Sequence, residues 1–485
     1  MILSKCTLSD ILSANVNLPA LSDFGLPEKV LQFGTGVLLR GLPDYFIDKA
    51  NKAGKFNGRI VVVKSTSKGG LVGFVEQDNL YTICVRGIEN GADAEENIIS
   101  SAISRVLDAN GEWDLILKFA TSPDLKLILS NTTEVGLVFL NEQIDRSVPE
   151  SYPGKLLAVL YERFKALGDS APELVVIATE LVPDNGKVLH KIIIELIACN
   201  SLEDKFTKWL EDYVTFCSSL VDRIVPGKPD QHLLNAMEKE LGYTDNLLIM
   251  AEPYRLWAIE GDQSVADLLS LEGVDKGLVV KPDIEIYREL KVRLLNGSHT
   301  LASGIAFLAG IDTVADAMSN KSLRQYIEHV MQREIIPAIP YAVNSKQAEE
   351  FAMKVLDRFS NPFIQHQWIN ITFQYTMKLK IRVIPVISQY YNIYNKVPEH
   401  VAYGFAAYLT FMTAGEVGGI VYKITDDSLD YISGIDKTNF VSSVLSDESL
   451  WGIDLNAFEG FKLAVERYFS YITKNGVIAG LALIQ

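Results

Sequence analysis

The pattern of apolar and polar positions divides the chain near residue 281. Before that point, short apolar runs rich in Val, Ile and Leu alternate with amphipathic segments and polar turns, as strands and helices do in α/β proteins. The runs that we expect to form strands are Lys29–Phe33, Arg59–Lys64, Leu80–Arg86, Lys126–Ser130, Glu173–Ala178, short stretches within Leu247–Ile259, and Gly277–Lys281. Their almost wholly apolar character is typical of parallel strands that are buried on both faces of a sheet. We expect helices at 96–108, 152–167 and 187–198.

From residue 282 to the end, the apolar residues recur almost everywhere with the helical period. The candidate helices are 283–309, 321–336, 346–358, 361–381, 400–415 and 456–474. The sequence therefore predicts an α/β domain with a mostly parallel sheet at 1–281, followed by a mainly α-helical domain at 282–485.

One of the predicted helices carries an unusual set of polar residues. Its apolar pattern between Tyr287 and Leu301 is interrupted by Lys291, Asn296 and His299. At about 100° per residue, Asn296 lies about 140° round the helix from Lys291, and His299 falls between them. One side of this helix can therefore present an amine, an amide and an imidazole to the same small molecule.

These three groups suit the transfer of a hydride to or from a carbon that bears oxygen. A partly desolvated lysine has a lowered pKa and can act as the general acid or base for that oxygen. Amide and imidazole N–H groups can hydrogen-bond the oxygen as charge develops on it. The alternative is a buried, partly polar helix in which Asn296 and His299 only satisfy neighbouring backbone groups.

A second candidate site follows the first predicted strand. Phe33 leads directly into Gly34-Thr35-Gly36, and an amphipathic segment comes next. A strand, a Gly-x-Gly turn and a helix form the opening of a Rossmann-like dinucleotide-binding domain, in which the glycines let the backbone approach a pyrophosphate at the helix N-terminus. Leu39 stands where the third glycine of that pattern is expected, so an ordinary strand-to-helix turn is the alternative.

Two further strand ends could contact a dinucleotide. The second predicted strand ends in Lys64, and no carboxylate follows up to Lys68, although an acidic residue that binds the adenosine ribose is expected there. A lysine could equally pair with a 2′-phosphate, so the choice between NAD and NADP stays open. Asn131 and Thr132 follow a later strand and could hold the ribose and nicotinamide, or could form only a polar turn.

The charge balance bears on the substrate. With 45 basic and 61 acidic side chains, the chain has a formal net charge of −16. Such a charge disfavours nucleic acid and anionic membranes, and an anionic substrate needs a local basic pocket. Lys378, which lies near Lys380 and Arg382 at the end of a predicted helix, is our candidate for binding a carboxylate. The alternative is a solvated helix end whose charges complement the helix dipole.

Other features of the sequence point to a cytoplasmic protein. No apolar run is long enough for a transmembrane helix, and the N-terminus lacks the pattern of a secretory signal. The four cysteines are scattered without C-x-x-C spacing, as expected of reduced thiols.

The run Phe216–Pro226 holds Asp222 and Arg223 between apolar flanks. A buried ion pair that fixes a loop is one interpretation. The other is functional, with Asp222 orienting the catalytic lysine and Arg223 binding the substrate.

Together, these motifs resemble the polyol-specific long-chain dehydrogenase family, which includes mannitol dehydrogenase and the fructuronate and tagaturonate reductases. The family's signature run is similar to Phe216–Pro226, and its Lys-x4-Asn-x2-His pattern is met by Lys291, Asn296 and His299. Runs similar to those of its tagaturonate-reducing members are Gln32–Arg40, Ser130–Glu134, Leu241–Tyr243, Leu294–Thr300, Gly310–Val314 and Arg358–Gln367. His366, within the last of these runs, is a further candidate for contact with the substrate.

The resemblance implies a Rossmann-like domain, a mostly helical C-terminal domain and an active site between them that uses no metal. It implies that Lys291 is the general acid/base and that Asn296 and His299 polarise the reacting oxygen. By the same resemblance, Asp222 holds the lysine and Lys378 lies near the substrate.

The reaction expected from this resemblance is the NAD-linked interconversion of tagaturonate and altronate. Mannitol-type members have an Asn where this chain has Leu181, an Arg where it has Asn370, and Phe-His where it has Leu38-Leu39. These departures favour a hexuronate reductase. The alternatives are a fructuronate reductase, a mannitol-type polyol dehydrogenase and, in another class, a non-catalytic dinucleotide sensor. The sequence does not predict an oligomeric state.

Overall fold

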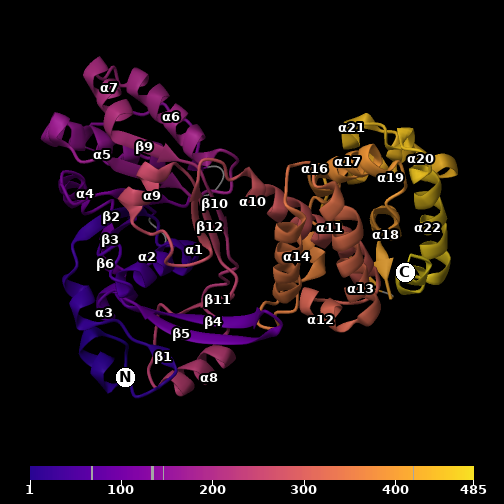
Figure 1. The fold of residues 1–485 in the computed structure, drawn as a ribbon, viewed down its shortest axis with the longest axis horizontal. Coiled ribbons are helices and arrows are strands. Elements are labelled where there is room, and N and C mark those ends of the chain that lie inside the picture. Colours follow the sequence, from indigo (N-terminus) through magenta and orange to yellow (C-terminus); the bar gives the residue numbers. More distant parts are fainter. Residues whose placement is uncertain (67–68, 133–135, 146, 419, 485) are drawn as a thin grey trace. The chain divides into compact units, whose positions relative to one another are not determined.

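A computed structural model describes the chain except for residues 67–68, 133–135, 146, 419 and 485. Parts of two motifs, Ser67–Lys68 and Thr133–Glu134, lie outside the described residues. The chain forms two compact units (Figure 1). Unit 1 comprises Met1–Arg86 and Ala94–Ile284, and unit 2 comprises Gly87–Asp93 and Glu285–Gln485. The predicted fold class, an α/β domain with a mostly parallel sheet followed by a mainly helical domain, is confirmed.

The central sheet of unit 1 has six parallel strands. Their order is β6 (Ile103–Asp108), β3 (Arg59–Lys64), β2 (Glu28–Phe33), β7 (Leu127–Ser130), β8 (Leu174–Ala178) and β9 (Val214–Cys217). Numbered along the chain, this is the order 3-2-1-4-5-6 of dinucleotide-binding folds. In such a sheet, ligands bind at the carboxyl ends of the strands beside the switch point, which here lies between β2 and β7.

Both faces of this sheet are covered, as the apolar strands predict. Leu31 and Val61 pack in a core with α4 (Trp113–Ala120), α5 (Tyr152–Leu167), α6 (Asn185–Cys199) and α7 (Asp204–Tyr213). Val30 and Val62 point to the opposite face and pack against α2 (Pro43–Lys52), β12 (Leu256–Glu260) and α9 (Gln263–Leu269). Because successive strand residues face opposite ways, a run of consecutive apolar residues such as 60–63 fits this two-sided burial.

Two smaller sheets lie mostly in unit 1, and only the ends of β4 and β5 around their turn belong to unit 2. One has the order β1 (Val16–Asn17), β5 (Ala92–Ser100), β4 (Tyr81–Glu89) and β11 (Ile249–Ala251), and the other has β10 (Ser219–Asp222), β12 and β13 (Leu278–Lys281). The remaining helices are α1 (Val37–Gly41), α3 (Val72–Glu76) and α8 (Gln231–Leu241). The helix predicted at 96–108 is wrong, because this segment forms parts of β5 and β6. Asn90 and Gly91, with φ of 55° and 75°, form a turn between β4 and β5, and Asn-Gly is a strong signal for a hairpin.

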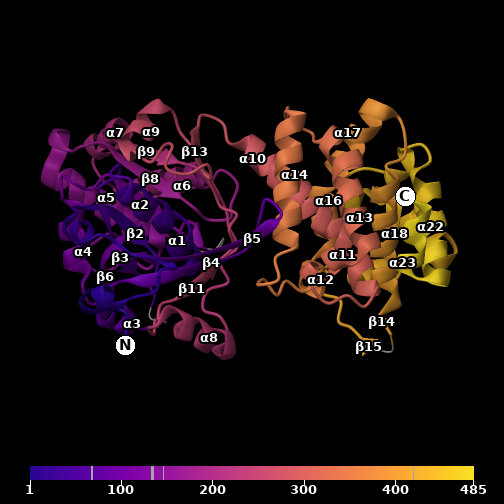
Figure 2. The same ribbon diagram turned by 60° about the horizontal axis from the view of Figure 1, so that its bottom comes forward.

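Unit 2 is built mainly of helices (Figure 2). Its first long helical segment runs through α10 (Glu285–Leu290), a π-helical segment (Lys291–Gly297) and α11 (Ser298–Leu308). α11 packs on α18 (Glu399–Ala414), and α18 packs on α22 (Phe461–Asn475). The other helices are α12 (Val314–Ser319), α13 (Lys321–His329), a second π-helical segment (Val330–Ile335), α14 (Ser345–Phe359), α15 (Trp368–Ile371), α16 (Tyr375–Arg382), α17 (Ile384–Tyr394), α19 (Leu429–Ser433), α20 (Phe440–Leu445), α21 (Glu448–Trp451) and α23 (Val477–Gly480), and β14 (Glu416–Val417) pairs with β15 (Ile420–Val421).

The single helix predicted at 361–381 is wrong. The segment forms a loop, α15 and the greater part of α16. Pro362 cannot donate a backbone hydrogen bond, and the side chain of Asn361 accepts one from the N–H of Phe363 at 3.0 Å, which forms a local turn. Gln374, with φ of 52°, then separates α15 from α16. Among the described residues, no helix is both long enough and apolar enough to cross a bilayer.

Candidate active site

The segment that carries Lys291, Asn296 and His299 is helical, but its central part is π-helical instead of α-helical. Backbone hydrogen bonds in a π-helix join residues five positions apart. Lys291 and Asn296 have this spacing, so they follow each other along the helix axis and are not separated by the about 140° of an α-helix. The change therefore brings the amine and the amide closer to one side than the sequence predicts. Both side chains are half-buried.

Two hydroxyl groups from the start of α11 hydrogen-bond carbonyls of this π-helical segment. Ser298 donates to the carbonyl oxygen of Leu294 at 2.5 Å, and Thr300 donates to that of Asn296 at 2.7 Å. Hydroxyl side chains commonly hydrogen-bond a carbonyl one turn earlier and perturb the helix there. Local sequence thus supports the unusual helix geometry at the candidate site.

The ring of His299 is buried among aromatic side chains. It stacks on Phe359 with ring centroids 4.1 Å apart, and it meets His366 and Trp368 edge-on at 5.0 Å and 5.4 Å. Its Nε2 atom is buried and has no hydrogen-bond partner among the described residues. A buried polar atom without a partner is costly, so Nε2 is suited to meet a polar atom of a ligand.

Electrostatics keep this imidazole neutral. Burial lowers the pKa of His299 well below its ordinary value, and His366, Arg382, Arg358 and Lys378 lower that pKa further. A neutral imidazole can present an N–H to an oxygen that gains negative charge during a reaction. Three of the four neighbouring groups are cations, so the surroundings of His299 also favour an anion.

Lys378 lies within this positive region. Its Nζ donates to the carbonyl oxygen of Ile371 at 2.8 Å. Burial, together with the charge of Arg382, lowers the pKa of Lys378 to about 8, and Asp426 opposes that shift. Burial also lowers the pKa of His366, with Lys378 adding to the effect. The structure thus brings the predicted residues Lys378 and His366 to the surroundings of His299.

The glycine turn of unit 1 has the shape that a pyrophosphate requires. Gly34 has a φ of 126°, which disfavours other residues, and at Gly36 no atom lies within 4 Å of the place that a Cβ would take. A Cβ on Gly41 would lie 2.9 Å from the side chain of Val225. Gly41 therefore allows close packing of the helix, the role of the third glycine in the usual pattern. The turn therefore leaves room for a dinucleotide, and the contact of Gly34, Thr35 and Gly36 with its phosphates stays a prediction.

Phe33 was predicted to contact the cofactor, but its side chain is buried in the core. It is 2% exposed, and its ring centroid lies 5.1 Å from that of Tyr152. As the last residue of β2, Phe33 directs its ring away from solvent. The strand uses this side chain for packing, and the predicted contact of Phe33 with the cofactor stays a prediction.

The side chain of Lys64 is bonded to other residues of unit 1. Its Nζ forms an ion pair with Asp108 at 3.1 Å and donates to the carbonyl oxygen of Thr66 at 2.6 Å. Lys64 and Asp108 are register partners on β3 and β6. The backbone N–H of Asn110 and the Lys64 amine lower the pKa of Asp108, so its carboxylate is ionised at neutral pH. The predicted interaction of Lys64 with a 2′-phosphate must therefore compete with Asp108.

Asn131 and Thr132 lie at the carboxyl end of β7 and contact the end of β8. Asn131 donates to the carbonyl oxygen and the hydroxyl of Thr179 at 2.9 Å and 3.0 Å. The backbone N–H of Thr132 donates to a carboxylate oxygen of Glu180 at 2.9 Å. Glu180 is 2% exposed, and burial raises its pKa. Glu180 was not among the predicted site residues, although an acidic residue two positions after a buried strand was a visible signal.

Asp222 is the last residue of β10, and Arg223 directly follows it. Asp222 is a buried residue at the end of β10, and its predicted role stays a prediction. Arg223 donates to the carbonyl oxygens of Glu252 and Gly41 at 2.9 Å and 2.7 Å, and its guanidinium lies 4.6 Å from the ring centroid of Tyr45. Arg223 therefore ties segments of unit 1 together, which argues against its predicted contact with a substrate.

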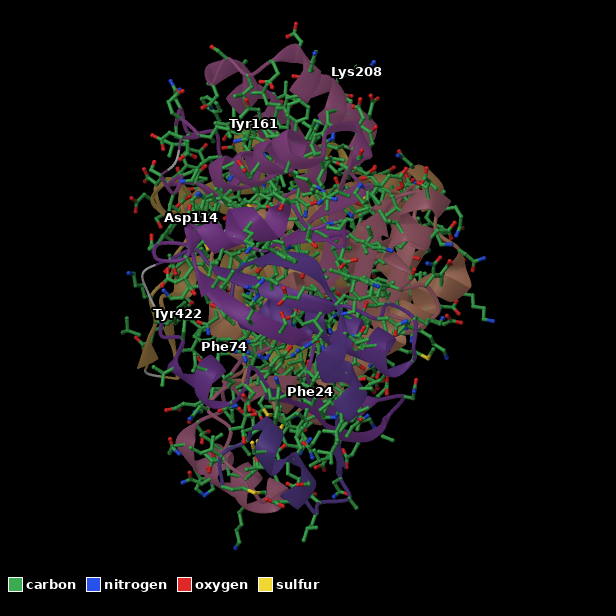
Figure 3. The ribbon with its side chains drawn as sticks, turned by 90° about the vertical axis from the view of Figure 1, so that its left-hand side faces the viewer. Phe24, Phe74, Asp114, Tyr161, Lys208 and Tyr422 are labelled. Atoms are coloured by element: carbon green, nitrogen blue, oxygen red, sulfur yellow. The ribbon has the colours of Figure 1, made fainter. Side chains whose placement is uncertain are left out.

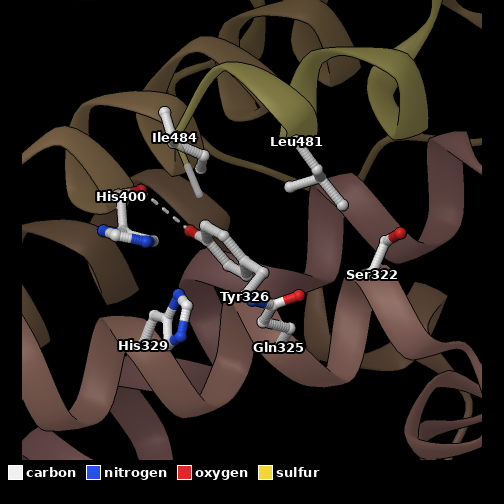
Figure 4. Close-up of a pocket in the computed structure, with 7 residues that line it drawn as sticks. All are labelled: Ser322, Gln325, Tyr326, His329, His400, Leu481 and Ile484. Carbon is white, nitrogen blue, oxygen red and sulfur yellow. Dashed lines mark hydrogen bonds between the residues drawn. The ribbon is translucent and has the colours of Figure 1, made fainter.

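A small cavity elsewhere in unit 2 is not a substrate site (Figure 4). Its volume is about 10 Å³, which is room for about one water molecule. Its lining residues are Ser322, Gln325, Tyr326, His329, His400, Leu481 and Ile484. Tyr326 donates to the carbonyl oxygen of His400 at 3.0 Å, and the ring Nδ1 of His400 lies 2.6 Å from a carboxylate oxygen of the buried Glu334. These groups hold helices together.

Comparison with known proteins covers both units. The family profile for the mannitol dehydrogenase Rossmann domain matches residues 28–273, and that for the mannitol dehydrogenase C-terminal domain matches residues 283–472. The altronate oxidoreductase of Halalkalibacterium halodurans is 36% identical over 474 residues, covering 93% of this chain and 91% of that protein. The altronate oxidoreductase of Bacillus subtilis is 34% identical over 461 residues, covering 93% and 94%.

Solved structures share the fold across the whole chain. The mannitol 2-dehydrogenase of Pseudomonas fluorescens, in a ternary complex with NAD and D-mannitol, has a TM-score of 0.72 at 22% identity and covers 100% of this chain and 99% of its own. A D-sorbitol dehydrogenase in substrate-free form has a TM-score of 0.80 at 20% identity, with coverage of 99% and 100%.

Proposed function

The chain belongs to the mannitol dehydrogenase family and is an oxidoreductase that acts on the CH–OH group of a polyol or sugar acid; within this class, we propose that it interconverts tagaturonate and altronate with NAD as cofactor. The observation that carries the choice of an acidic substrate is the set of cations around His299. Arg358, Lys378 and Arg382 all act on this ring, although the chain as a whole has a net charge of −16. The relatives named altronate oxidoreductase agree with an acidic substrate.

In this proposal, Lys291 donates a proton to the ketone oxygen as the ketone is reduced. The reduced nicotinamide, when bound, supplies the hydride that adds to the carbonyl carbon. Asn296 and the neutral ring of His299 hydrogen-bond the oxygen while negative charge grows on it. In the reverse direction Lys291 removes the hydroxyl proton, so the same residue serves as acid and as base. Asp222 is proposed to orient the lysine.

In this proposal, two groups of residues in unit 1 bind different parts of the dinucleotide. Gly34, Thr35 and Gly36 lie at the start of α1, where backbone N–H groups can bind the pyrophosphate. Asn131 and Thr132 lie at the carboxyl end of β7, across the switch point from the glycine turn. There they can bind the ribose and the carboxamide on the nicotinamide side.

The proposed substrate is tested by a comparison of initial rates. We expect kcat/KM for tagaturonate to exceed that for fructuronate, and kcat/KM for fructose to be lower still, with the reaction followed at the nicotinamide absorbance. The physical reason is that both hexuronates carry the anion that the cations around His299 favour, whereas fructose does not. A clear preference for fructose would overturn the proposed substrate class. A preference for fructuronate would replace tagaturonate as the substrate.

NAD is preferred over NADP in this proposal because Lys64 is already paired. The Lys64 side chain is 8% exposed and that of Asp108 is 32% exposed, so a 2′-phosphate would approach a carboxylate before it reached the amine. Asp108 also supplies, from β6, the acidic group that β3 lacks and that can bind a ribose hydroxyl. Replacing Asp108 with Asn should therefore free Lys64 and change the cofactor preference.

We expect Asp108→Asn to raise the ratio of kcat/KM for NADPH to that for NADH by about tenfold, the effect of one charge-assisted hydrogen bond. Dissociation constants from nicotinamide fluorescence should show the same change without turnover. Asp114, an exposed residue in the first turn of α4 (Figure 3), provides the matched control. Asp114→Asn should leave the ratio unchanged. An unchanged ratio in Asp108→Asn would contradict the assignment of cofactor choice to this ion pair.

A further inference from the structure

Helix α16 carries two cations on one side. Lys378 and Arg382 are four residues apart, and side chains with this spacing are neighbours on a helix surface. Like charges at this spacing disfavour the helix, and both side chains are half-buried. Among the described residues, no carboxylate forms an ion pair with either of them; their polar contacts are with a carbonyl and a hydroxyl. Partly desolvated cations of this kind favour an anionic ligand.

The end of α16 is fixed to the π-helical segment. Arg293, in that segment, donates from Nη1 to the carbonyl oxygens of Ile381 and Arg382 at 2.5 Å and 3.1 Å. Arg293 is itself oriented by an ion pair with Glu289 at 2.9 Å. These bonds cap the C-terminus of α16 and set the position of Arg382 relative to the candidate active site.

The side chain of Arg382 is also bonded to the helical segment that carries Asn296 and His299. Its Nη1 donates to the hydroxyl of Thr300 at 2.9 Å, and Thr300 in turn donates to the carbonyl oxygen of Asn296. Thr300 directly follows His299. Burial lowers the pKa of Arg382 to about 10, so the guanidinium is charged at neutral pH. A guanidinium has five N–H donors, and among the described residues the Arg382 guanidinium bonds only the Thr300 hydroxyl, which leaves donors for a ligand.

We propose that Arg382, together with Lys378, binds the carboxylate of the sugar-acid substrate and thereby selects acidic over neutral ketoses. The planar guanidinium can form two parallel hydrogen bonds with a carboxylate, which an ammonium cannot do. The link through Thr300 places that carboxylate at a fixed distance from Asn296 and His299, and so positions the ketone for reduction. This inference rests on the proposed function, since it supplies the ligand for the hexuronate's acid group.

The test compares an acid and a neutral substrate in matched variants. Arg382→Gln should lower kcat/KM for tagaturonate by about 10- to 100-fold, mostly through KM. It should change kcat/KM by less than about threefold for the ketose that has a hydroxymethyl group in place of the carboxylate. Arg382→Lys keeps the charge without the planar fork and should recover part of the loss. Lys380→Gln is the control, because Lys380 lies on the same helix and the one hydrogen bond that its Nζ makes within the described residues is to the carbonyl oxygen of Ser449, at 3.3 Å.

Binding measured without turnover separates a ligand contact from a structural role. Calorimetry with the NAD-loaded enzyme measures this binding. Arg382→Gln should raise the dissociation constant of altronate by a similar factor and leave the dissociation constant of the corresponding neutral polyol unchanged. Equal losses for acid and neutral ligands would overturn the inference and leave Arg382 as a support for Thr300. If the wild-type enzyme reduced only the neutral ketose, the proposed function would itself fail, and that result is visible before any variant is made.

Discussion

Replacing Lys291 with Ala is expected to lower kcat for reduction of the keto acid by about 10²- to 10⁴-fold, the usual contribution of a general acid. The ketone oxygen must gain a proton as the hydride arrives, and without the ammonium only water can provide it. Affinity for NADH should stay within about twofold of the parental value, because the lysine acts on the reacting oxygen and not on the dinucleotide. Initial rates and nicotinamide fluorescence measure the two quantities.

Chemical rescue makes this prediction specific. Small primary amines added to Lys291→Ala should restore part of kcat, because they can deliver the missing proton. Lys321 offers a matched control, since it is an exposed lysine at the start of α13 in the same unit, and Lys321→Ala should keep the parental rate. A parental rate in Lys291→Ala would rule out this lysine as the acid. Loss without amine rescue would place Lys291 in a structural role.

The periodicity of the sequence was sufficient to predict the architecture. Buried parallel strands such as β3 hold an unbroken apolar run, here 60–63 between Arg59 and Lys64. The long helices of unit 2 repeat their apolar residues with the period of an α-helix, so both classes of element leave a clear local signal. The errors fell where a few residues overrode the wider pattern. Asn90 and Gly91 turned the chain back into β5 where a helix was expected, and Pro362 broke a helix that the pattern favoured.

The candidate site was predictable in part. The spacing of Lys291, Asn296 and His299 is a local property that could be read directly, whereas the π-helical geometry depends on hydroxyls that bond back to carbonyls. Interactions between distant parts of the chain were not visible. A sequence cannot show that Lys64 is already paired with Asp108 on a neighbouring strand, or that Arg223 is engaged by two backbone carbonyls. For the same reason, the sequence indicated Lys378 as a candidate for binding a carboxylate but did not show the hydrogen bond between Arg382 and Thr300.

Replacing His299 with Leu should lower kcat by about 10²- to 10³-fold, which is the typical cost of removing one preorganised donor to a developing oxyanion. The effect is expected because the ring's Nε2 is buried and has no hydrogen-bond partner among the described residues. It is therefore free of competing bonds there and can hydrogen-bond the oxygen of a ligand. Leucine keeps an apolar side chain against Phe359 and Trp368, so the thermal midpoint should change less than in a variant that opens a cavity. Substrate binding should weaken less than kcat falls.

The pH dependence of this loss tests the charge state of the ring. Burial and the cations Arg382, Arg358 and Lys378 lower the pKa of His299 well below its ordinary value, so the imidazole is neutral throughout the range in which a free histidine titrates, near pH 6.5. The ratio of wild-type to His299→Leu kcat should therefore be the same at about pH 6 and about pH 8. Asn296→Ala should give a loss of similar size with the same flat ratio, because an amide does not titrate. A ratio that changes through the ordinary histidine range would mean that His299 gains a proton there, and that it acts as a charged group instead of a neutral donor.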